Sequence, residues 1–90
     1  MNYTCPVCGY DNLERPPADY HICPCCGTEF GYDDFTFSHG ELRKRWIANG
    51  MRWHRRRTGP PPDWNPIAQL FKAGFASDVP PSEHNALIEK

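Results

Sequence analysis

Four of the five cysteines stand in two matching Cys-x-x-Cys pairs, a spacing that is typical of tetrahedral metal sites. Cys5 and Cys8 form the first pair, and Cys23 and Cys26 form the second. In each pair a proline restricts the turn, and a glycine after the second cysteine tolerates the positive φ that lets the chain leave it. The 14 residues between the pairs are close to the separation found in four-cysteine zinc sites. The sequence therefore predicts one structural Zn²⁺ ion bound by these four thiolates.

Cys25 is the spare cysteine, because alignment of the two turns matches it with Val7. We expect its side chain to point away from the ion, as a small buried hydrophobic group or as a reactive thiol; valine at the matching position favours the first. His21 is a ligand in principle, but with four better-spaced thiolates we expect a half-exposed strand residue. Iron can occupy the same thiolates, and zinc is favoured since nothing indicates an electron-transfer partner. A closed site has no open coordination position, so we expect a structural metal.

The rest of the chain contains no recognisable catalytic motif. A Gly-rich phosphate loop, a nucleophile elbow and a His-Glu-x-x-His pattern are all missing from the sequence. Asp33, Asp34 and His39 could assist chemistry or hold a second ion, although a solvated acidic turn is the simpler interpretation. We therefore expect a binding protein that is not an enzyme and has no small-molecule substrate.

The chain has 90 residues, enough for one domain whose small core often needs a metal for stability. Residues 1–11 lack the basic and apolar regions of a signal peptide, and no apolar run approaches the roughly 20 residues that span a bilayer. We therefore expect a cytoplasmic protein without membrane contact. Thiols stay reduced in the cytoplasm, which favours a metal site over a set of disulfides or redox cysteines.

The net charge of −1 conceals a strong asymmetry along the chain. Residues 1–42 carry a balance of −6, whereas residues 43–57 carry +7 and no acid. Cationic and aromatic side chains are interleaved in this basic block, a combination that proteins binding single-stranded nucleic acid use for phosphates and bases. The favoured contact residues are Arg52, Trp53, Arg55, Arg56 and Arg57. Alternatively, the acidic part of the chain neutralises the block within the molecule, and Trp46 belongs to the core.

Two helices are predicted after the cysteine turns. Ser38 is a good N-cap and Glu41 completes a capping box, which together start a helix over residues 39–49. After the proline-rich stretch at 59–62, Asn65 can cap a second and shorter helix. Its first residue would be a proline, and its apolar side would be formed by Ile67, Leu70 and Phe71.

Together these elements predict a small α+β fold. Residues 1–36 are expected to be a zinc ribbon with its two cysteine turns on short β-hairpins. The aromatic stretch 30–37 is either a short strand or an ordered connection. Residues 37–79 are expected to add one firm helix and one or two short ones, packed on the ribbon as one domain. Residues 80–90 are expected to form a tail.

The two cysteine turns, with Leu-Arg-Lys-Arg-Trp-Ile at 42–47 and Pro-Pro-Asp-Trp-Asn-Pro at 61–66, resemble the cysteine-rich CPCC family of bacterial proteins. The resemblance extends over roughly residues 3 to 70. It implies that the cysteines bind a metal and that the chain is one domain. The family has no settled biochemical function, so the resemblance implies no activity.

The sequence thus predicts a zinc-binding module that acts by binding a macromolecule. The partner is either a nucleic acid, contacted through the Arg/Trp block, or a protein. A protein partner would fit a role such as toxin neutralisation or that of an effector accessory. A third interpretation is a thiol redox protein that uses Cys25.

Overall fold

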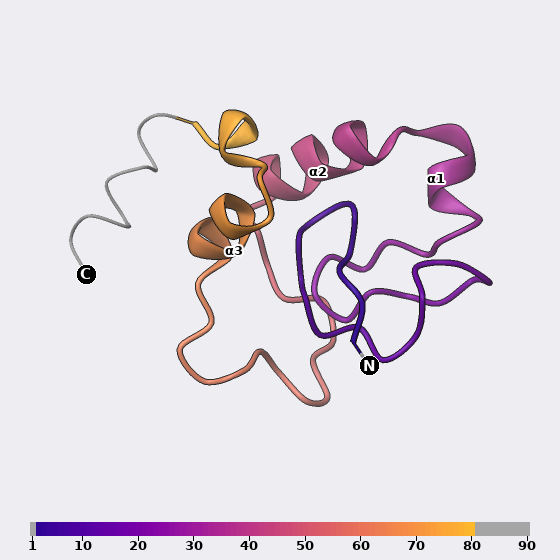
Figure 1. The fold of residues 1–90 in the computed structure, drawn as a ribbon, viewed down its shortest axis with the longest axis horizontal. Coiled ribbons are helices and arrows are strands. Elements are labelled where there is room, and N and C mark those ends of the chain that lie inside the picture. Colours follow the sequence, from indigo (N-terminus) through magenta and orange to yellow (C-terminus); the bar gives the residue numbers. More distant parts are fainter. Residues whose placement is uncertain (1, 81–90) are drawn as a thin grey trace.

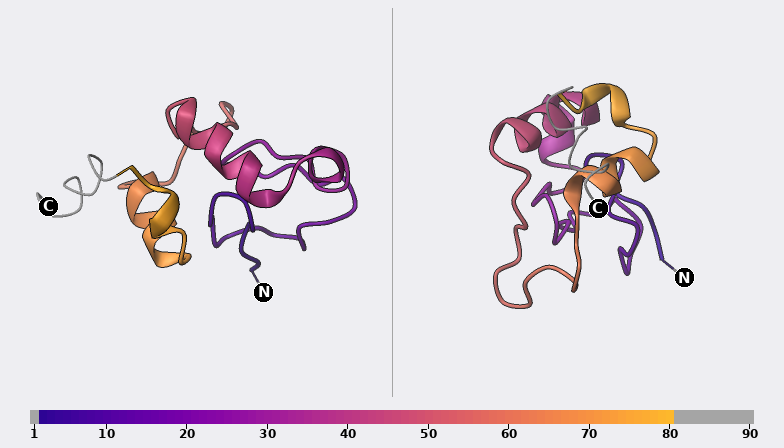
Figure 2. Two further views of the ribbon diagram at one scale, coloured as in Figure 1. Left: turned by 90° about the horizontal axis from the view of Figure 1, so that it is seen from above. Right: turned by 90° about the vertical axis from the view of Figure 1, so that its left-hand side faces the viewer.

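The computed structural model describes residues 2–80, so Met1 and residues 81–90, which make up nearly all of the predicted tail, lie outside the described part. In chain order its elements are α1 (Asp33–Thr36), α2 (His39–Ala48), α3 (Pro66–Lys72) and the 3₁₀ helix η1 (Ala76–Asp78). Irregular loops form the N-terminal third. Figures 1 and 2 show α2 lying across one side of these loops, with η1 beside it. No helix within residues 2–80 is long and apolar enough to span a membrane.

The two cysteine turns have the same backbone hydrogen bonds, and we call them knuckle one (residues 5–10) and knuckle two (residues 23–28). In knuckle one the amide of Cys5 donates to Tyr10 O, and the amide of Gly9 donates to Cys5 O. In knuckle two Cys23 and Gly27 donate to the residues at the corresponding positions. Both glycines have positive φ, +86° at Gly9 and +79° at Gly27. The predicted repeat is therefore a structural repeat.

The predicted β-hairpins are not confirmed, because the described residues contain no strand. Each knuckle is flanked by a single antiparallel bridge, Tyr3 to Leu13 for the first and Ile22 to Glu29 for the second. The N-terminal third is consequently held by turns and not by a sheet.

The connection after knuckle two, which the sequence left open, contains one helical turn, α1. Its two acidic residues accept local backbone bonds: Asp33 Oδ2 from the amide of Glu29 at 2.8 Å and Asp34 Oδ1 from the amide of Gly31 at 2.6 Å. The other carboxylate oxygen of Asp34 lies 3.1 Å from His39 Nε2. These carboxylates therefore stabilise the start of α1 and its junction with α2.

The predicted N-terminus of α2 is confirmed. Ser38 Oγ accepts from the amide of Glu41, and Glu41 Oε1 accepts from the amide of Ser38, which completes the capping box. The helix ends at Ala48, one residue before the predicted limit. Trp46 faces the core with 7% of its surface exposed, as predicted.

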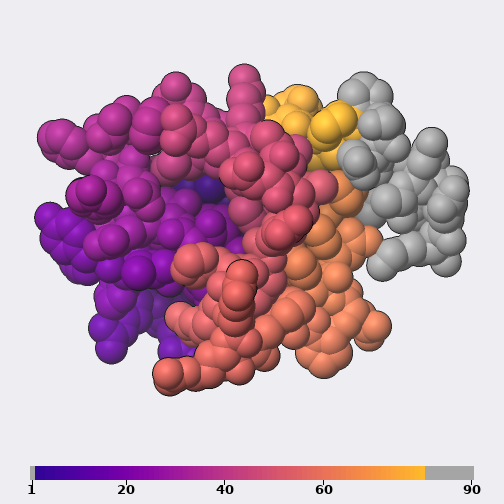
Figure 3. All heavy atoms as spheres, turned by 180° about the vertical axis from the view of Figure 1, so that it is seen from behind, coloured from indigo at the N-terminus to yellow at the C-terminus, as the bar shows by residue number. Residues whose placement is uncertain are grey.

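The predicted second helix is also confirmed as α3. The side chain of Asn65 accepts from the amides of Ile67 and Ala68, and Pro66 is the first helical residue. Ile67 and Leu70 are buried, and they join one hydrophobic cluster with the cysteines, Phe30 and Trp46. Figure 3 shows the segment around residues 50–60 lying between the N-terminal third and α3.

Candidate metal centre

The four predicted ligands come together, because their sulfur atoms all lie within 4.8 Å of one another. The Cys5–Cys26 and Cys8–Cys23 sulfur pairs are each 3.8 Å apart. A tetrahedron with Zn–S bonds of about 2.3 Å has edges of about 3.8 Å. The two knuckles therefore present a donor set that fits a tetrahedral metal ion, and no other group of potential ligands gathers within residues 2–80.

Crowding of the four sulfurs perturbs the ionisation of their thiols. Hydrogen bonding to the sulfur of Cys23 raises the pKa of both the Cys5 and the Cys8 thiols far above their usual range. A hydrogen bond from Cys23 lowers the pKa of Cys26 far below it. A bound divalent cation would let all four ionise, with release of protons.

Nearby polar groups support the sulfurs. The amide of Val7 donates to Cys5 Sγ at 3.4 Å. The buried hydroxyl oxygen of Thr28 lies 3.2 Å from Cys26 Sγ and can donate to it when that sulfur is a thiolate. Such partners outside the ligand set orient the donors and disperse their charge.

Cys25 does not belong to the four-sulfur group, and its side chain is completely buried, like that of Val7 at the matching position. Gln69 Nε2 on α3 donates to Cys25 Sγ at 3.4 Å and to Cys8 O at 3.0 Å. His21 is half-buried and also outside the group; its Nε2 lies 3.5 Å from Arg15 Nη1. The reactivity of Cys25 stays a prediction.

Arg43 holds knuckle one, a role that the sequence analysis missed. Its Nε and Nη2 donate to Val7 O and Pro6 O, each at 2.7 Å, and its Nη1 forms a 2.8 Å ion pair with Asp78. The guanidinium also lies 3.4 Å from the ring centroid of Phe75. One signal was available: Arg43 stands three residues before Trp46 and so shares its helix face. Arg43 is therefore a buried anchor and not part of the exposed basic surface.

Knuckle two is held by the backbone of the basic block. The amides of His54 and Arg55 donate to Cys25 O and Pro24 O, each at 2.9 Å. These acceptors correspond to Val7 O and Pro6 O in knuckle one. The His54 ring covers Gly27 so closely that a Cβ there would lie 2.6 Å from His54 Nδ1. The segment around residue 54 is thus fixed directly to the metal-binding turn.

The predicted contact residues differ in their surroundings. Trp53 is half-buried between Tyr10 and Trp64, with edge-to-face ring centroids at 5.2 and 5.3 Å. Trp64 is half-buried as well, and its Nε1 donates to Gln69 Oε1. The arginines are exposed, and none forms an ion pair within residues 2–80: Arg52, Arg55, Arg56 and Arg57. The acidic side chains of residues 1–42 therefore do not neutralise these four arginines by direct ion pairing.

Comparison with known proteins gives a family and two relatives. Residues 3–47 match the family described as "Cysteine-rich CPCC". The uncharacterised protein YozI of Bacillus subtilis is 36% identical over 73 residues, which cover 56% of this chain and 60% of YozI. The uncharacterised protein YoaQ of the same organism is 34% identical over 71 residues, which cover 54% and 60%. The chain thus spans 60% of the length of these relatives. No solved structure matches.

Proposed function

The chain belongs to the cysteine-rich CPCC family, and we propose that it is a structural zinc module that binds single-stranded nucleic acid through the exposed arginines of residues 52–57. The observation that carries this proposal is the backbone pairing of His54 and Arg55 with knuckle two. This pairing ties residues 52–57, which we call the basic segment, to knuckle two, the turn that supplies two of the four predicted metal ligands. Metal binding would thereby determine the shape of the contact surface.

Zinc is the metal that we propose for the centre. The sulfur spacing suits tetrahedral coordination, which zinc and iron share when all four ligands are thiolates. Four protein ligands leave no position for a substrate or water, so the role is structural. Elemental analysis of the purified protein should give one zinc per chain. A coloured protein with stoichiometric iron would contradict this part of the proposal.

The nucleic-acid role is supported by exposed charge without internal partners. Four arginines on one segment can each neutralise a phosphate. Trp53 offers only part of its surface because its ring packs against Tyr10 and Trp64. We therefore expect phosphate contacts to supply most of the affinity, with little preference for base sequence.

Salt dependence of binding tests this role. The zinc-loaded chain is titrated into fluorescent 12-nucleotide single strands at several salt concentrations, and the anisotropy is measured. We expect log K to fall against log[salt] with a slope of about −3, because each neutralised phosphate of a single strand contributes roughly −0.7. Replacing Arg56 and Arg57 with glutamine should reduce the slope to about −1.5.

The matched control is Lys44→Gln, which removes an exposed charge from α2, outside the basic segment. It should bind like the parent chain. Chelation of the metal should abolish binding, since knuckle two then loses its conformation. Absence of binding, or binding that is insensitive to salt, would remove the nucleic-acid role and leave the zinc module standing.

A protein partner is the second candidate, and exposed aromatic rings around α1 favour it. Tyr20, Tyr32 and Phe35 are 66%, 67% and 88% exposed. With Phe37 they line a hollow of about 400 Å³. Exposed apolar patches of this kind mark protein contacts. Toxin neutralisation or an effector accessory role would use such a surface. Host proteins captured by the parent chain and lost with Phe35→Ser, while oligonucleotide binding is unchanged, would support this candidate.

The thiol redox interpretation gains no support from the position of Cys25. Its sulfur is completely buried and contacts Gln69. An oxidant or a partner disulfide needs access to the thiolate. Alkylation of the folded, zinc-loaded chain should leave Cys25 unmodified. Rapid modification of Cys25 with zinc still bound would revive the redox role.

A further inference from the structure

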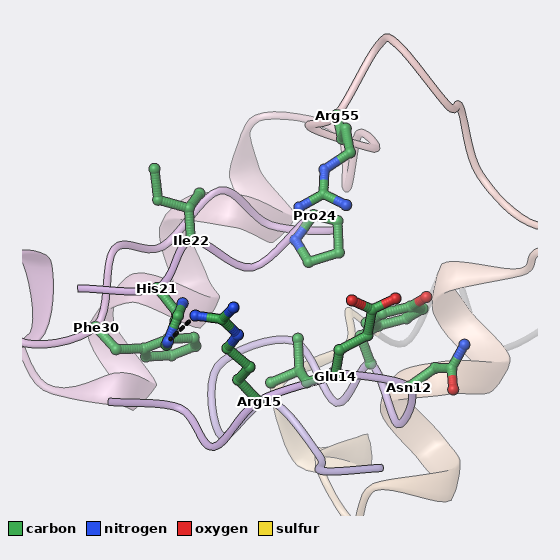
Figure 4. A pocket seen from close by; sticks show the side chains of 10 residues that line it. Asn12, Glu14, Arg15, His21, Ile22, Pro24, Phe30 and Arg55 are labelled. Carbon is green, nitrogen blue, oxygen red and sulfur yellow. Dashed lines mark hydrogen bonds between the residues drawn. The ribbon is translucent and has the colours of Figure 1, made fainter. Parts of the chain in front are cut away.

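A second hollow, of about 340 Å³, lies between knuckle two and the loop that follows Leu13. Figure 4 shows its walls, which are supplied by both segments together with Arg55 from the basic block. Part of the wall is apolar, including Pro24 and Ile22. The lining residues with polar side chains are Tyr10, Asn12, Glu14, Arg15, His21 and Arg55. The wall is therefore mainly polar with a smaller apolar part, a lining that favours a polar or charged ligand.

Two arginines that are distant in sequence face this hollow. Arg15 follows the Tyr3–Leu13 bridge, and Arg55 is positioned by the bond from its amide to Pro24 O. Their guanidinium groups point into the hollow from opposite sides (Figure 4). The backbone of Arg55 is therefore fixed to knuckle two, whereas Arg15 lies in the loop two residues after the bridge.

Neither guanidinium is neutralised within the described part of the chain. Arg15 and Arg55 form no ion pair there, whereas Arg43 and Lys72 have carboxylates at 2.8 and 2.9 Å. Arg15 Nη1 instead lies 3.5 Å from a ring nitrogen of His21. Two cations on one hollow repel each other unless an anion lies between them. Glu14 is the one carboxylate among the lining residues, so two guanidinium groups and one carboxylate give the hollow a net positive charge, which favours an anionic ligand.

We propose that this hollow binds a nucleoside monophosphate unit, with its phosphate held by Arg15 and Arg55. A carboxylate can satisfy one guanidinium fork, whereas a phosphate has enough terminal oxygens to accept from both. The volume is at the lower end of the range for small-ligand sites, which suits one nucleotide. Glu14 and Asn12 supply acceptors for the N–H and O–H groups of a base and sugar. Pro24 and Ile22 supply apolar contact, which inorganic phosphate would not use.

The nucleotide can be free or part of a strand, and the chemistry of recognition is the same. If it belongs to a strand, the proposal rests on the nucleic-acid role described above and extends it: Arg55 then links the basic segment to a pocket for one nucleotide. If the nucleotide is free, the proposal stands without that role. The test has to separate these two sources.

The test follows amide chemical shifts of the ¹⁵N-labelled, zinc-loaded full chain by NMR. The probes are the four common ribonucleoside monophosphates, adenosine and inorganic phosphate, followed by a 12-nucleotide single strand. We expect at least one monophosphate to give saturable shifts at Arg15, Ile22 and Arg55, with adenosine and phosphate binding far more weakly. Arg15→Gln and Arg55→Gln should each raise Kd about tenfold or more, the loss expected for a charge-assisted hydrogen bond. Lys44→Gln should leave Kd unchanged.

The outcomes separate the two proposals. Monophosphate binding without tighter binding of the strand supports this site and overturns the nucleic-acid role. Strand binding that Arg15→Gln does not weaken, with no monophosphate binding, overturns this site and leaves the nucleic-acid role. Shifts spread evenly over all exposed arginines would also overturn it. Variants count only if their spectra retain the dispersion of the zinc-loaded fold.

Discussion

At the scale of single residues, the exposed carbonyl oxygens of the two knuckles are bound by different kinds of hydrogen-bond donor. Each turn exposes two successive carbonyl oxygens, of Pro6 and Val7 in the first and of Pro24 and Cys25 in the second. The Arg43 side chain binds the first pair, and backbone amides bind the second. A Zn²⁺ ion with four thiolates carries a net charge of about −2. With zinc bound there, the guanidinium beside knuckle one would also offset negative charge at the proposed metal centre.

Replacement of Arg43 should be among the most destabilising changes outside the cysteines. Arg43→Gln leaves the carbonyls of knuckle one without their donor and leaves Asp78 without its ion-pair partner. We expect the free energy of unfolding of the zinc-loaded chain to fall by about 2–4 kcal/mol. Chemical denaturation followed by tryptophan fluorescence measures it.

Lys44→Gln, one residue along α2 and exposed, is the control for this prediction and should change stability by less than about 0.5 kcal/mol. If the two variants are equally stable, Arg43 is not an anchor of knuckle one.

At the scale of elements, the helices are too short to be stable alone. The longest, α2, has 10 residues, below the roughly 12–15 that an isolated helix needs. Close packing of the helices against the knuckles, at positions where only a particular residue type fits, compensates for the short length of the helices. A Cβ on Gly9 would lie 2.6 Å from the Cβ of Ala73, so knuckle one approaches the end of α3 only because Gly9 has no side chain. The positive φ of Gly9 adds a second reason for glycine there.

The capping box of α2 has a measurable contribution. Ser38→Ala should destabilise the zinc-loaded chain by about 1 kcal/mol, the usual effect of losing an N-cap side chain. The backbone hydrogen bond from Ser38, followed by the one from its side chain, lowers the pKa of Glu41 below its ordinary value of 4.5. Loss of the hydroxyl should therefore raise the Glu41 pKa toward that value, as measured by NMR titration of the carboxyl carbon.

The sign of the pH effect follows from the lowered pKa. The contribution of ionised Glu41 is complete above its ordinary pKa and is lost as pH falls through the lower value in the folded chain. Ser77→Ala is the matched control, because Ser77 is exposed within η1 and caps no helix. A Glu41 pKa at its ordinary value of 4.5 in the parent chain would show that the capping box is not formed in solution.

At the scale of the whole molecule, the cysteine cluster lies where the described parts of the chain meet. The hydrophobic cluster includes the ligand cysteines together with Trp46 of α2 and Leu70 of α3. The basic segment is bound to knuckle two by its backbone. With no sheet within residues 2–80 and only short helices, few contacts remain that could hold the fold without the ion.

Metal removal should therefore unfold the helices as well as the knuckles. A strong chelator should abolish NMR dispersion at Trp46 and Leu70, although neither residue is a ligand, and restored zinc should bring it back. Cys5→Ser should reproduce the effect and lower the zinc content. Cys25→Ser should keep one zinc per chain and its dispersion. A metal-free chain with an intact α2 would contradict a fold organised by the metal.

Local patterns predicted correctly those features that depend on neighbouring residues. The grouping of the four cysteines, the glycines of the two turns, the N-cap at Ser38 and the Asn65-Pro66 start of α3 were predicted from the sequence. Each depends on spacing of a few residues or on a hydrogen bond within one turn of the chain. Trp46 was also placed correctly, because a helical face repeats over a short distance.

Only the tertiary structure decided how distant segments meet. The structure has single bridges in place of the predicted hairpins. How far two segments pair depends on long-range packing, which no local pattern reveals. The Arg43 side chain binds knuckle one instead of joining the exposed basic surface. The Trp53 ring packs between Tyr10 and Trp64. Arg15 and Arg55, which are far apart in the chain, line the same hollow. The sequence by itself determined the two cysteine turns and the helix starts, because those are local. The partners of the arginines and tryptophans depend on long-range packing, which composition and spacing do not encode.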